Sequence, residues 1–316
     1  MSTDSLKVLI VAGGLTHERD VSVRSGRRVA NSLINQGFDA KVVDFDQNLP
    51  AEISAFGPDV VWPLVHGSLG EDGSLQSLLE GVGVPYVGST PAQAMLASNK
   101  PTAKALVGAA GLDTPGWIAL PQLLFRQLGA HNVLGMINSS LTFPLVVKPS
   151  SGGSALGMSR AQDPGDLRSA MVDAFSYEEH VMLERFVEGR DIAVSVVDLE
   201  EGPIALPPVE VSTDDGHYDY EARYTTDESE YFVPARLSND EMTDVQAAAI
   251  QIHELLGLRD LSRIDFIVDD NGSFWFIDAN VSPGMTDTSL FPQAAEATGS
   301  FDEICAAIVR YVASRD

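Results

Sequence analysis

The N-terminal part of the chain alternates short apolar runs with a segment of helical spacing. The expected strands are Lys7–Ala12, Ala40–Phe45 and Val60–Val65, with a helix at Val21–Gln36. Strands that alternate with helices favour a parallel sheet, and ligands bind such sheets at the carboxyl ends of the strands. We therefore expect an N-terminal α/β domain with a binding site beside its strand ends.

Two loops follow these predicted strand ends, Gly13–Ser22 and His66–Gly73. Neither has the glycine spacing of a dinucleotide-binding loop, and the chain has no P-loop motif. Glu18 and His66 are the candidate ligand-binding residues of these loops. The alternatives are structural: an acidic residue suits the first turn of a helix, and His66 would then be an ordinary loop histidine.

A predicted hairpin near the C-terminus places polar groups on one face. Asn271-Gly272 lies between two apolar, aromatic-rich runs, which indicates a two-residue turn. Such a turn sets Asp265 opposite Asp278. It also sets Arg263 opposite Asn280, and side chains alternate along strands, so these four share one face. The predicted core face comprises Ile264, Phe266, Val268, Trp275, Ile277 and Ala279.

The polar face of this hairpin has a composition that suits a hard cation. Two carboxylates opposite each other repel, and together with an amide oxygen they offer the ligands that Mg²⁺ prefers. The segment that follows, Ser282–Thr286, is a turn of small and hydroxyl residues whose backbone N–H groups can face an anion. The alternative is a solvated hairpin face with ordinary charges.

The middle of the chain predicts a nucleotide-binding module. A boundary is expected at residues 98–101, where a proline suits the first turn of a helix, so the predicted domains are 1–99, 100–190 and 191–316. A strand ends at Lys148 and leads into the Gly/Ser-rich segment 150–157, whose N–H groups can approach phosphates. The alternative is a surface loop. A strand at Val181–Gly189 ends in a mixture that suits adenine and ribose.

A polar, aromatic segment at 214–231 has neither strand nor helix periodicity. Long loops in compact enzymes often cover a site, so we expect a lid with Arg223 and Tyr224 near its middle. The alternative is an exposed insertion.

Composition excludes several classes of protein. The formal net charge is −25, with 45 acidic and 20 basic residues, which argues against nucleic acid or an anionic membrane as partner. The single cysteine, Cys305, excludes an intramolecular disulfide and lies in an apolar run, so we expect a buried structural thiol. The N-terminus lacks a signal-peptide pattern and no run is long enough for a membrane span, which favours a cytoplasmic protein.

Six patterns, taken together, resemble a known family. They are Gly13-Gly14 with Glu18-Arg19 and Val21-Ser22; His66-Gly67 with Gly70-Glu71-Asp72-Gly73; Lys148-Pro149 with Gly153-Ser154; Tyr218-Asp219-Tyr220-Glu221-Ala222; Arg263 with Asp265-Phe266; and Asn280 with Pro283-Gly284-Met285-Thr286 and Ser289. In this order and spacing, over nearly the whole chain, they resemble the D-alanine–D-alanine ligase family. The resemblance implies a parallel α/β domain followed by a two-module ATP-grasp fold of α/β and α+β class, and a homodimer. It also implies ATP-dependent joining of two D-alanines through an acyl phosphate, for peptidoglycan precursors.

The resemblance also implies roles for individual residues. Lys100 and Lys148 would hold nucleotide phosphates, and Glu184, Phe186, Val187 and Asp191 would face adenine and ribose. Asp265, Asp278 and Asn280 would bind Mg²⁺ or Mn²⁺, with two ions expected. Glu18 would anchor the first D-alanine with His66 close by, and Ser289 would receive the carboxylate of the second. Arg263 and the Gly284 N–H would stabilise the oxyanion, and Ser154 and Tyr224 would join Glu18 in a hydrogen-bonded group that links the lid to substrate.

The chain departs from the family pattern at two positions. Asp278 stands where the family usually has glutamate, which puts the metal count and turnover in question. Arg223 stands where lysine is usual, and a planar fork replaces a point charge. Two alternatives stay open: a ligase of the same fold that joins other amino acids or a hydroxy acid, which Tyr224 disfavours, and a nucleotide-binding regulatory protein without turnover, which Arg263, Asp265 and Asn280 disfavour.

Overall fold

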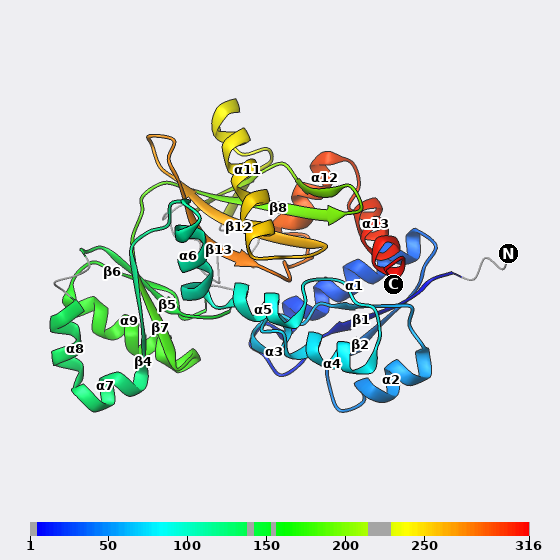
Figure 1. Ribbon diagram of the computed structural model, residues 1–316, viewed down its shortest axis with the longest axis horizontal. Helices are drawn as coiled ribbons and strands as arrows, with labels where there is room; N and C mark the ends of the chain where they lie inside the picture. The colour runs from blue at the N-terminus through cyan, green and yellow to red at the C-terminus, as the bar shows by residue number, and fades with distance from the viewer. Residues whose placement is uncertain (1–4, 138–141, 153–155, 214–228, 316) are drawn as a thin grey trace.

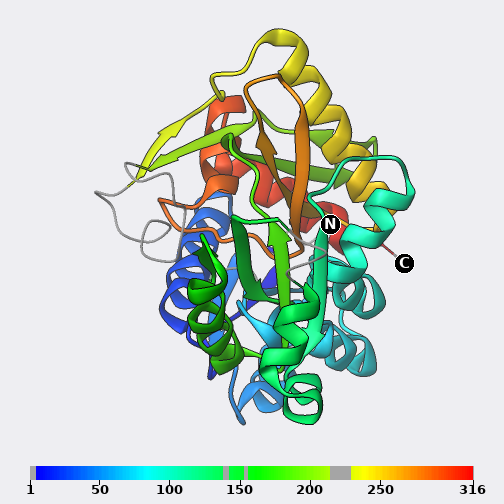
Figure 2. The same ribbon diagram turned by 90° about the vertical axis from the view of Figure 1, so that its left-hand side faces the viewer.

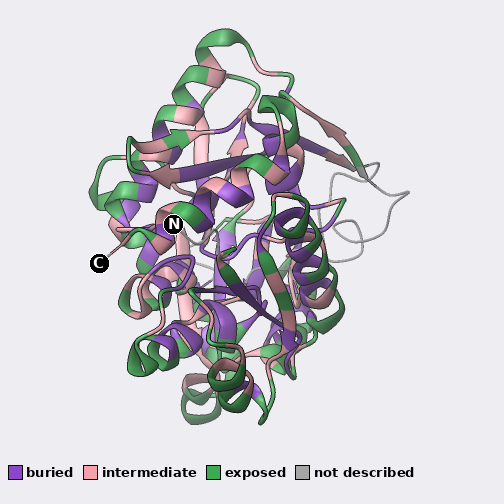
Figure 3. Ribbon diagram, turned by 90° about the vertical axis from the view of Figure 1, so that its right-hand side faces the viewer, coloured by how far each residue is buried: buried purple, intermediate pink, exposed green. Residues whose placement is uncertain are grey.

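The computed structural model describes residues 5–137, 142–152, 156–213 and 229–315. Three sheets organise it: one parallel sheet near the N-terminus, one antiparallel sheet in the middle of the chain, and a larger antiparallel sheet towards the C-terminus (Figure 1). Buried residues gather along the strands, and the exposed ones lie on the outer helices and loops (Figure 3).

The N-terminal sheet is parallel, as the sequence predicted, with the order β2-β1-β3. Its strands are β1 (Lys7–Ala12), β2 (Asp39–Asp44) and β3 (Val60–Pro63), and the helices of this region are α1 (Arg19–Asn35), α2 (Leu49–Phe56), α3 (Ser68–Glu71), α4 (Ser74–Val82) and α5 (Pro91–Ser98). The loops that carry Glu18 and His66 both leave the carboxyl ends of strands, β1 and β3, so the parallel arrangement brings them to one edge.

The central sheet has the order β4-β7-β5-β6, and its neighbours are antiparallel. Its strands are β4 (Trp117–Pro121), β5 (Leu145–Pro149), β6 (Ser159–Ala161) and β7 (His180–Arg185), with helices α7 (Gln122–Leu128), α8 (Ala130–Ile137) and α9 (Pro164–Tyr177). β5 ends at Lys148-Pro149, immediately before the Gly/Ser-rich segment.

Helix α6 (Lys100–Ala109) begins where the sequence predicted, because Asn99 caps it: the Asn99 side-chain oxygen accepts a hydrogen bond from the Thr102 backbone N–H, and Pro101 occupies the first turn. The buried face of α6 packs against the large sheet as well as the central sheet. Ala103 and Val107 lie in the core of the large sheet. The predicted boundaries at 99/100 and 190/191 stay predictions.

The large sheet is antiparallel, with the order β11-β10-β8-β12-β13 and β9 paired to β8. Its strands are β8 (Arg190–Leu199), β9 (Gly202–Ala205), β10 (Val209–Thr213), β11 (Ser229–Phe232), β12 (Leu261–Val268) and β13 (Phe274–Asn280), with helices α11 (Asn239–Leu255), α12 (Leu290–Thr298) and α13 (Phe301–Ala313). The hairpin β12–β13, in orange, lies above the green central sheet (Figure 2).

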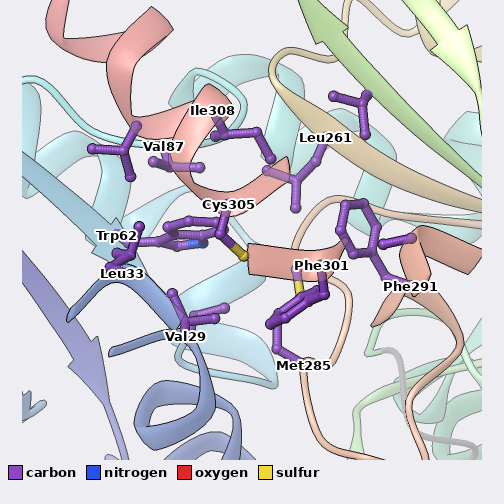
Figure 4. Close-up of a cluster of buried hydrophobic side chains, with 14 of the residues drawn as sticks. Val29, Leu33, Trp62, Val87, Leu261, Met285, Phe291, Phe301, Cys305 and Ile308 are labelled. Carbon is purple, nitrogen blue, oxygen red and sulfur yellow. The ribbon is translucent and has the colours of Figure 1, made fainter. Parts of the chain in front are cut away.

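The C-terminal helix α13 returns to the N-terminal domain and joins its core. Trp62 of β3 and Leu33 of α1 belong to the same buried cluster as Cys305 of α13 (Figure 4). Cys305 is fully buried, and burial raises the pKa of its thiol to about 12. The prediction of a buried structural thiol is therefore confirmed.

Candidate active site

The turn of the β12–β13 hairpin is longer than the sequence predicted. The backbone N–H of Asp269 donates to the Ser273 carbonyl at 2.9 Å, and the Gly272 N–H donates to the Asp269 carbonyl at 3.0 Å. Three residues therefore form the turn, and the predicted two-residue turn is wrong. The cause is Asp269, whose Oδ1 accepts from the N–H groups of Asn271 and Ser273 and so stabilises the wider loop.

A β-bulge at Ile277 compensates for the longer turn. Near the turn Phe266 pairs with Phe276, but beyond the bulge Asp265 pairs with Asp278, as predicted. One extra residue on β13 therefore restores the predicted register at the charged positions.

The bulge also changes which residues of β13 face the core. Phe276 is buried and Phe274 packs against the same cluster, so the placement of Trp275 and Ile277 on the core face is wrong. Ile277 instead lines the cavity described below. The predicted core positions Ile264, Phe266, Val268 and Ala279 are buried.

The facing carboxylates of the hairpin are each paired with a cation of the protein. Arg263 donates to both oxygens of Asp265, from Nε at 2.7 Å and from Nη2 at 2.8 Å. Asp278 forms a close ion pair with Lys100 at the start of α6. These pairs reduce the repulsion across the ladder, so the carboxylates do not require a metal ion for their stability. The Asn280 Oδ1 accepts from the Ser282 N–H at 2.8 Å and shapes the turn that follows.

A second charged cluster joins the central sheet to α6. The Glu184 carboxylate on β7 is fully enclosed, and it pairs with Lys148 Nζ at 2.7 Å through one oxygen and closely with Lys104 Nζ through the other. Burial lowers the pKa of Lys104 to about 8, although the charge of Glu184 opposes this shift. Burial by itself would raise the pKa of Glu184, but the two lysine ammonium groups outweigh it and lower the pKa.

The N-terminal domain closes one side of the site with two buried residues. Glu18 is buried and lies close to Gly67, since a Cβ on Gly67 would be 2.8 Å from Glu18 Oε2. His66 lies one layer behind: its Nε2 is 3.3 Å from Ser25 Oγ, which also accepts from the Met285 N–H at 3.0 Å. His66 therefore supports the segment that holds Gly284.

The segment after β13 brings Gly284 and Ser289 together. A Cβ on Gly284 would be 2.8 Å from Ser289 Oγ, so a larger residue at this position would displace the Ser289 side chain. Ser289 Oγ accepts from the Thr286 N–H at 3.0 Å and lies 2.8 Å from Thr286 Oγ1. Ser289 is the residue that precedes α12, at the positive end of the helix dipole.

A cavity of about 300 Å³ lies where the three sheets meet. Six of the predicted site residues line it: Glu18, Lys100, Lys148, Asp191, Asp265 and Asp278. Among the described residues, the predicted ones that do not line it are His66, Glu184, Phe186, Val187, Arg263, Asn280, Gly284 and Ser289. Asn280 borders an adjacent recess with Asp278 and Lys100. The Arg160 guanidinium stacks on the Phe186 ring, with Cζ 3.7 Å from the ring centroid.

Ser154, Arg223 and Tyr224 lie outside the described residues, as does most of the predicted lid. Its last three residues, 229–231, belong to β11, which pairs with β10.

Sequence reasoning missed four residues at this site: Lys104, Ile277, Tyr177 and Glu178. The last three line the cavity, and Glu178 Oε2 accepts from the Ser151 N–H at 2.8 Å at the start of the Gly/Ser-rich segment. Lys104 had a usable signal, because it follows Lys100 by four residues and so shares its helix face.

Two further findings bear on ligands and location. In the described ranges no three His, Cys, Asp or Glu side chains group as metal ligands. No helix in the described part of the chain has the length and apolar character needed to cross a membrane.

Two antiparallel modules and a parallel α/β domain border one cavity, whose lining includes Lys100 and Lys148, and this arrangement defines an ATP-grasp fold. Family models for the N-terminus and C-terminus of D-ala D-ala ligase match residues 47–89 and 106–310. The chain belongs to the D-alanine–D-alanine ligase family.

Individual relatives agree with this membership. The D-alanine–D-alanine ligase of Bordetella petrii is 37% identical over 98% of this chain and 93% of its own length. The crystal structure of D-alanine–D-alanine ligase from Bacillus anthracis superposes with a TM-score of 0.83 at 27% identity, covering 98% of this chain and 97% of that one. A crystal structure of D-alanine–D-alanine ligase from Bacillus anthracis complexed with ATP gives a TM-score of 0.80 at 25% identity, covering 98% of this chain and 97% of that one.

Proposed function

We propose that this protein joins two molecules of D-alanine to D-alanyl-D-alanine with consumption of ATP, for peptidoglycan precursor synthesis. The observation that carries the proposal is the cavity lined by Glu18 on one side and by Lys100, Lys148, Asp265 and Asp278 on the other. The Glu18 carboxylate can bind an ammonium group, and across the same cavity Lys100 and Lys148 can bind phosphates.

The chemistry requires activation of a poor electrophile. A carboxylate oxygen of the first D-alanine attacks the γ-phosphorus of ATP, the bond to ADP breaks, and an acyl phosphate forms. The amine of the second D-alanine then attacks the acyl carbon, loses a proton, and phosphate leaves. The protein contributes position and charge, because neither step needs a covalent bond to the enzyme.

The nucleotide would lie between the two antiparallel modules. We assign its phosphates to Lys100 and Lys148, both of which line the cavity. Asp191, also in the lining, would accept from the ribose hydroxyls. Glu184, Phe186 and Val187, at the end of β7, would border the adenine, with Glu184 acting through its pairing to Lys148.

The hairpin would hold the metal ions. Asp265 and Asp278 are neighbours across the ladder, and their oxygens with Asn280 form a hard donor set. This set fits Mg²⁺ or Mn²⁺ shared with nucleotide phosphates, since Mg²⁺ usually keeps substrate oxygens among its ligands. When bound, the ions neutralise phosphate charge. The family resemblance implies two ions, and Asp278, whose side chain is one methylene shorter than the usual glutamate, is the ligand at which this chain departs from the family pattern.

The amino acids would lie on the opposite side. Glu18 would bind the ammonium of the first D-alanine, with His66 supporting the wall behind it. Arg263 and the Gly284 N–H would stabilise the tetrahedral oxyanion, and Ser289 would bind the carboxylate of the second D-alanine. Ser154 and Tyr224, which lie outside the described residues, would form the hydrogen-bonded group with Glu18 that the family resemblance implies, and Arg223 would lie beside Tyr224 in the predicted lid.

The experiment is a phosphate-release screen with ATP across D-amino acids and D-hydroxy acids, with products identified by mass spectrometry. The expected result is phosphate release when D-alanine is the only amino acid added with ATP, together with a product that has the mass of D-alanyl-D-alanine. A different dipeptide or a depsipeptide would reassign the substrate, and nucleotide binding without release would favour the regulatory alternative. We further propose a cytoplasmic homodimer, which light scattering and fractionation test.

A further inference from the structure

Lys104 is a buried lysine to which no role has so far been assigned. Its side chain is fully enclosed on α6. The ammonium group forms a close ion pair with Glu184, and it donates hydrogen bonds at 2.8 Å both to Thr114 Oγ1 and to the Phe276 carbonyl. A buried lysine is costly unless paired, and here the Glu184 carboxylate and two oxygen acceptors offset that cost.

The charges of this cluster do not cancel. Two lysines, Lys104 and Lys148, share the single carboxylate of Glu184, and within the described part of the chain neither has another ion pair. Two positive charges and one negative charge leave one surplus positive charge. Of the three residues, Lys148 alone lines the cavity, so the surplus faces the ligand.

We propose that Lys104 is a positioning residue for the nucleotide phosphates: it neutralises Glu184, so that the charge of Lys148 acts on the phosphates. Without Lys104, Glu184 and Lys148 form a neutral pair, and Lys148 loses most of its attraction for an anion. This inference rests on the proposed function, because it assumes that nucleotide phosphates occupy the cavity.

Lys104 has a structural connection as well. The Phe276 carbonyl that it contacts precedes the bulge at Ile277, and the Phe276 N–H donates to the Asp113 carbonyl at 2.8 Å. Loss of Lys104 therefore also loosens the join between α6 and the hairpin. The test consequently needs a measurement that reports phosphate attraction separately from stability.

That measurement is the ratio of affinities for ADP and adenosine, determined by calorimetry with Mg²⁺ in constant excess. Lys104→Gln removes the charge and keeps an N–H donor. We expect its ADP affinity to fall roughly 10- to 100-fold, the range for a hydrogen bond to a charged group, with adenosine affinity unchanged. Lys41→Met, which removes a surface lysine paired with Glu52, is the matched control and should change neither.

Two further variants test whether the ratio of ADP to adenosine affinity rises and falls with the net charge of the cluster. Glu184→Gln leaves two lysines without their carboxylate, so the ratio of ADP to adenosine affinity should rise. The double variant Lys104→Gln/Glu184→Gln restores one surplus charge and should return the ratio towards that of the wild type. If Lys104→Gln does not fold, the rise in Glu184→Gln and its reversal in the double variant still test the inference.

The outcomes separate this inference from the proposed function. Absence of ADP binding by the wild type would overturn the proposed function. With wild-type binding intact, an unchanged ratio in Lys104→Gln, an equal loss of ADP and adenosine affinity, or a fall in the ratio in Glu184→Gln would each overturn the role of Lys104.

Discussion

The two charged walls of the cavity use the same residue types in different proportions. On the hairpin, each carboxylate has one cation, Arg263 for Asp265 and Lys100 for Asp278. On the central-sheet side, two lysines share Glu184. The hairpin therefore presents two neutral ion pairs, whereas the lysine cluster carries one surplus positive charge while Lys104 is protonated. Both walls contain carboxylates and cations, and the number of cations for each carboxylate is what distinguishes them.

The walls also differ in how they are built. The hairpin charges come from two adjacent strands, where alternation and register fix their positions. The lysine cluster comes from three separate elements, α6, β5 and β7, which only the tertiary fold brings together. Variants on each wall should consequently fail in different ways.

The largest effect is expected on the hairpin wall, from Asp265→Asn. The change removes a negative charge from the metal-binding face and one partner from Arg263, so turnover should fall close to background while the fold is retained. Phosphate release with D-alanine, together with circular dichroism, measures both. Asp270→Asn, an exposed position in the turn of the same hairpin, should behave as wild type. Normal turnover in Asp265→Asn would end the metal-binding assignment.

Arg263→Lys should have the next largest effect. A lysine cannot reproduce the bidentate contact with Asp265, and its single ammonium would not hold the oxyanion donor in the same position, so kcat should fall about 10²- to 10³-fold. Arg190→Lys, in the neighbouring strand, alters a partly exposed ion pair with Glu241 and a hydrogen bond to the Arg236 carbonyl; Arg190 does not line the cavity, so this variant is the control. A change in KM for ATP with kcat unaltered would make Arg263 a nucleotide ligand instead.

The lysine wall should respond to pH. The pKa of Lys104 is lowered to about 8, so the residue is charged below this pH and neutral above it. Glu184, Lys148 and Asp278 are the charged groups that act on it. ADP affinity should therefore decrease as pH rises through about 8, and Lys104→Gln should not show this decrease. If the ADP affinity of the wild type and that of Lys104→Gln depended on pH in the same way, a group other than Lys104 would be responsible for the titration.

The same shift has a consequence for stability. Between about 8 and the ordinary lysine value of 10.5, the unfolded chain keeps the proton that folded Lys104 has lost. The unfolded state thus binds more protons, and this lysine's contribution to the free energy of unfolding should rise with pH across that window. Denaturant titrations of wild type and Lys104→Gln at several pH values check the sign.

The smallest effect should come from the turn itself. Gly272 has φ of 79°, so Gly272→Ala should lower the free energy of unfolding by about 1 kcal/mol and leave kcat unchanged, because the bulge isolates the charged positions from the turn. Gly81→Ala, in helix α4 with open space around it, should be neutral or stabilising. Loss of activity in Gly272→Ala would mean that the turn controls the register at Asp265.

The hairpin illustrates how far local patterns reach. The pairing of Asp265 with Asp278 was predicted and is confirmed, but by a different route: a longer turn and a bulge that offset each other. The misplacement of Trp275 and Ile277 follows from the same cause. The alternation of apolar and polar residues does not reveal that the Asp269 side chain accepts hydrogen bonds from the turn, or that β13 contains one extra residue.

His66 and Glu184 show a second limit. Both were predicted close to ligand, and both lie one layer behind the cavity, where they support Ser25 and Lys148. His66 follows β3 and Glu184 lies within β7, and each is next to a residue that lines the cavity, Gly67 and Lys148 respectively. Their distance from the cavity depends on how the sheets meet, which no local pattern encodes.

The sequence by itself determined the parallel N-terminal sheet, the start of α6, the buried thiol of Cys305 and the set of motifs that mark the family, because each depends on neighbours a few residues apart or on fixed spacing. Only the tertiary structure decided that Lys104 meets Glu184, that Ile277 turns into the cavity and that Asp278 pairs with Lys100. Those contacts join residues far apart in the chain, and their partners are selected by the packing of three sheets against one another.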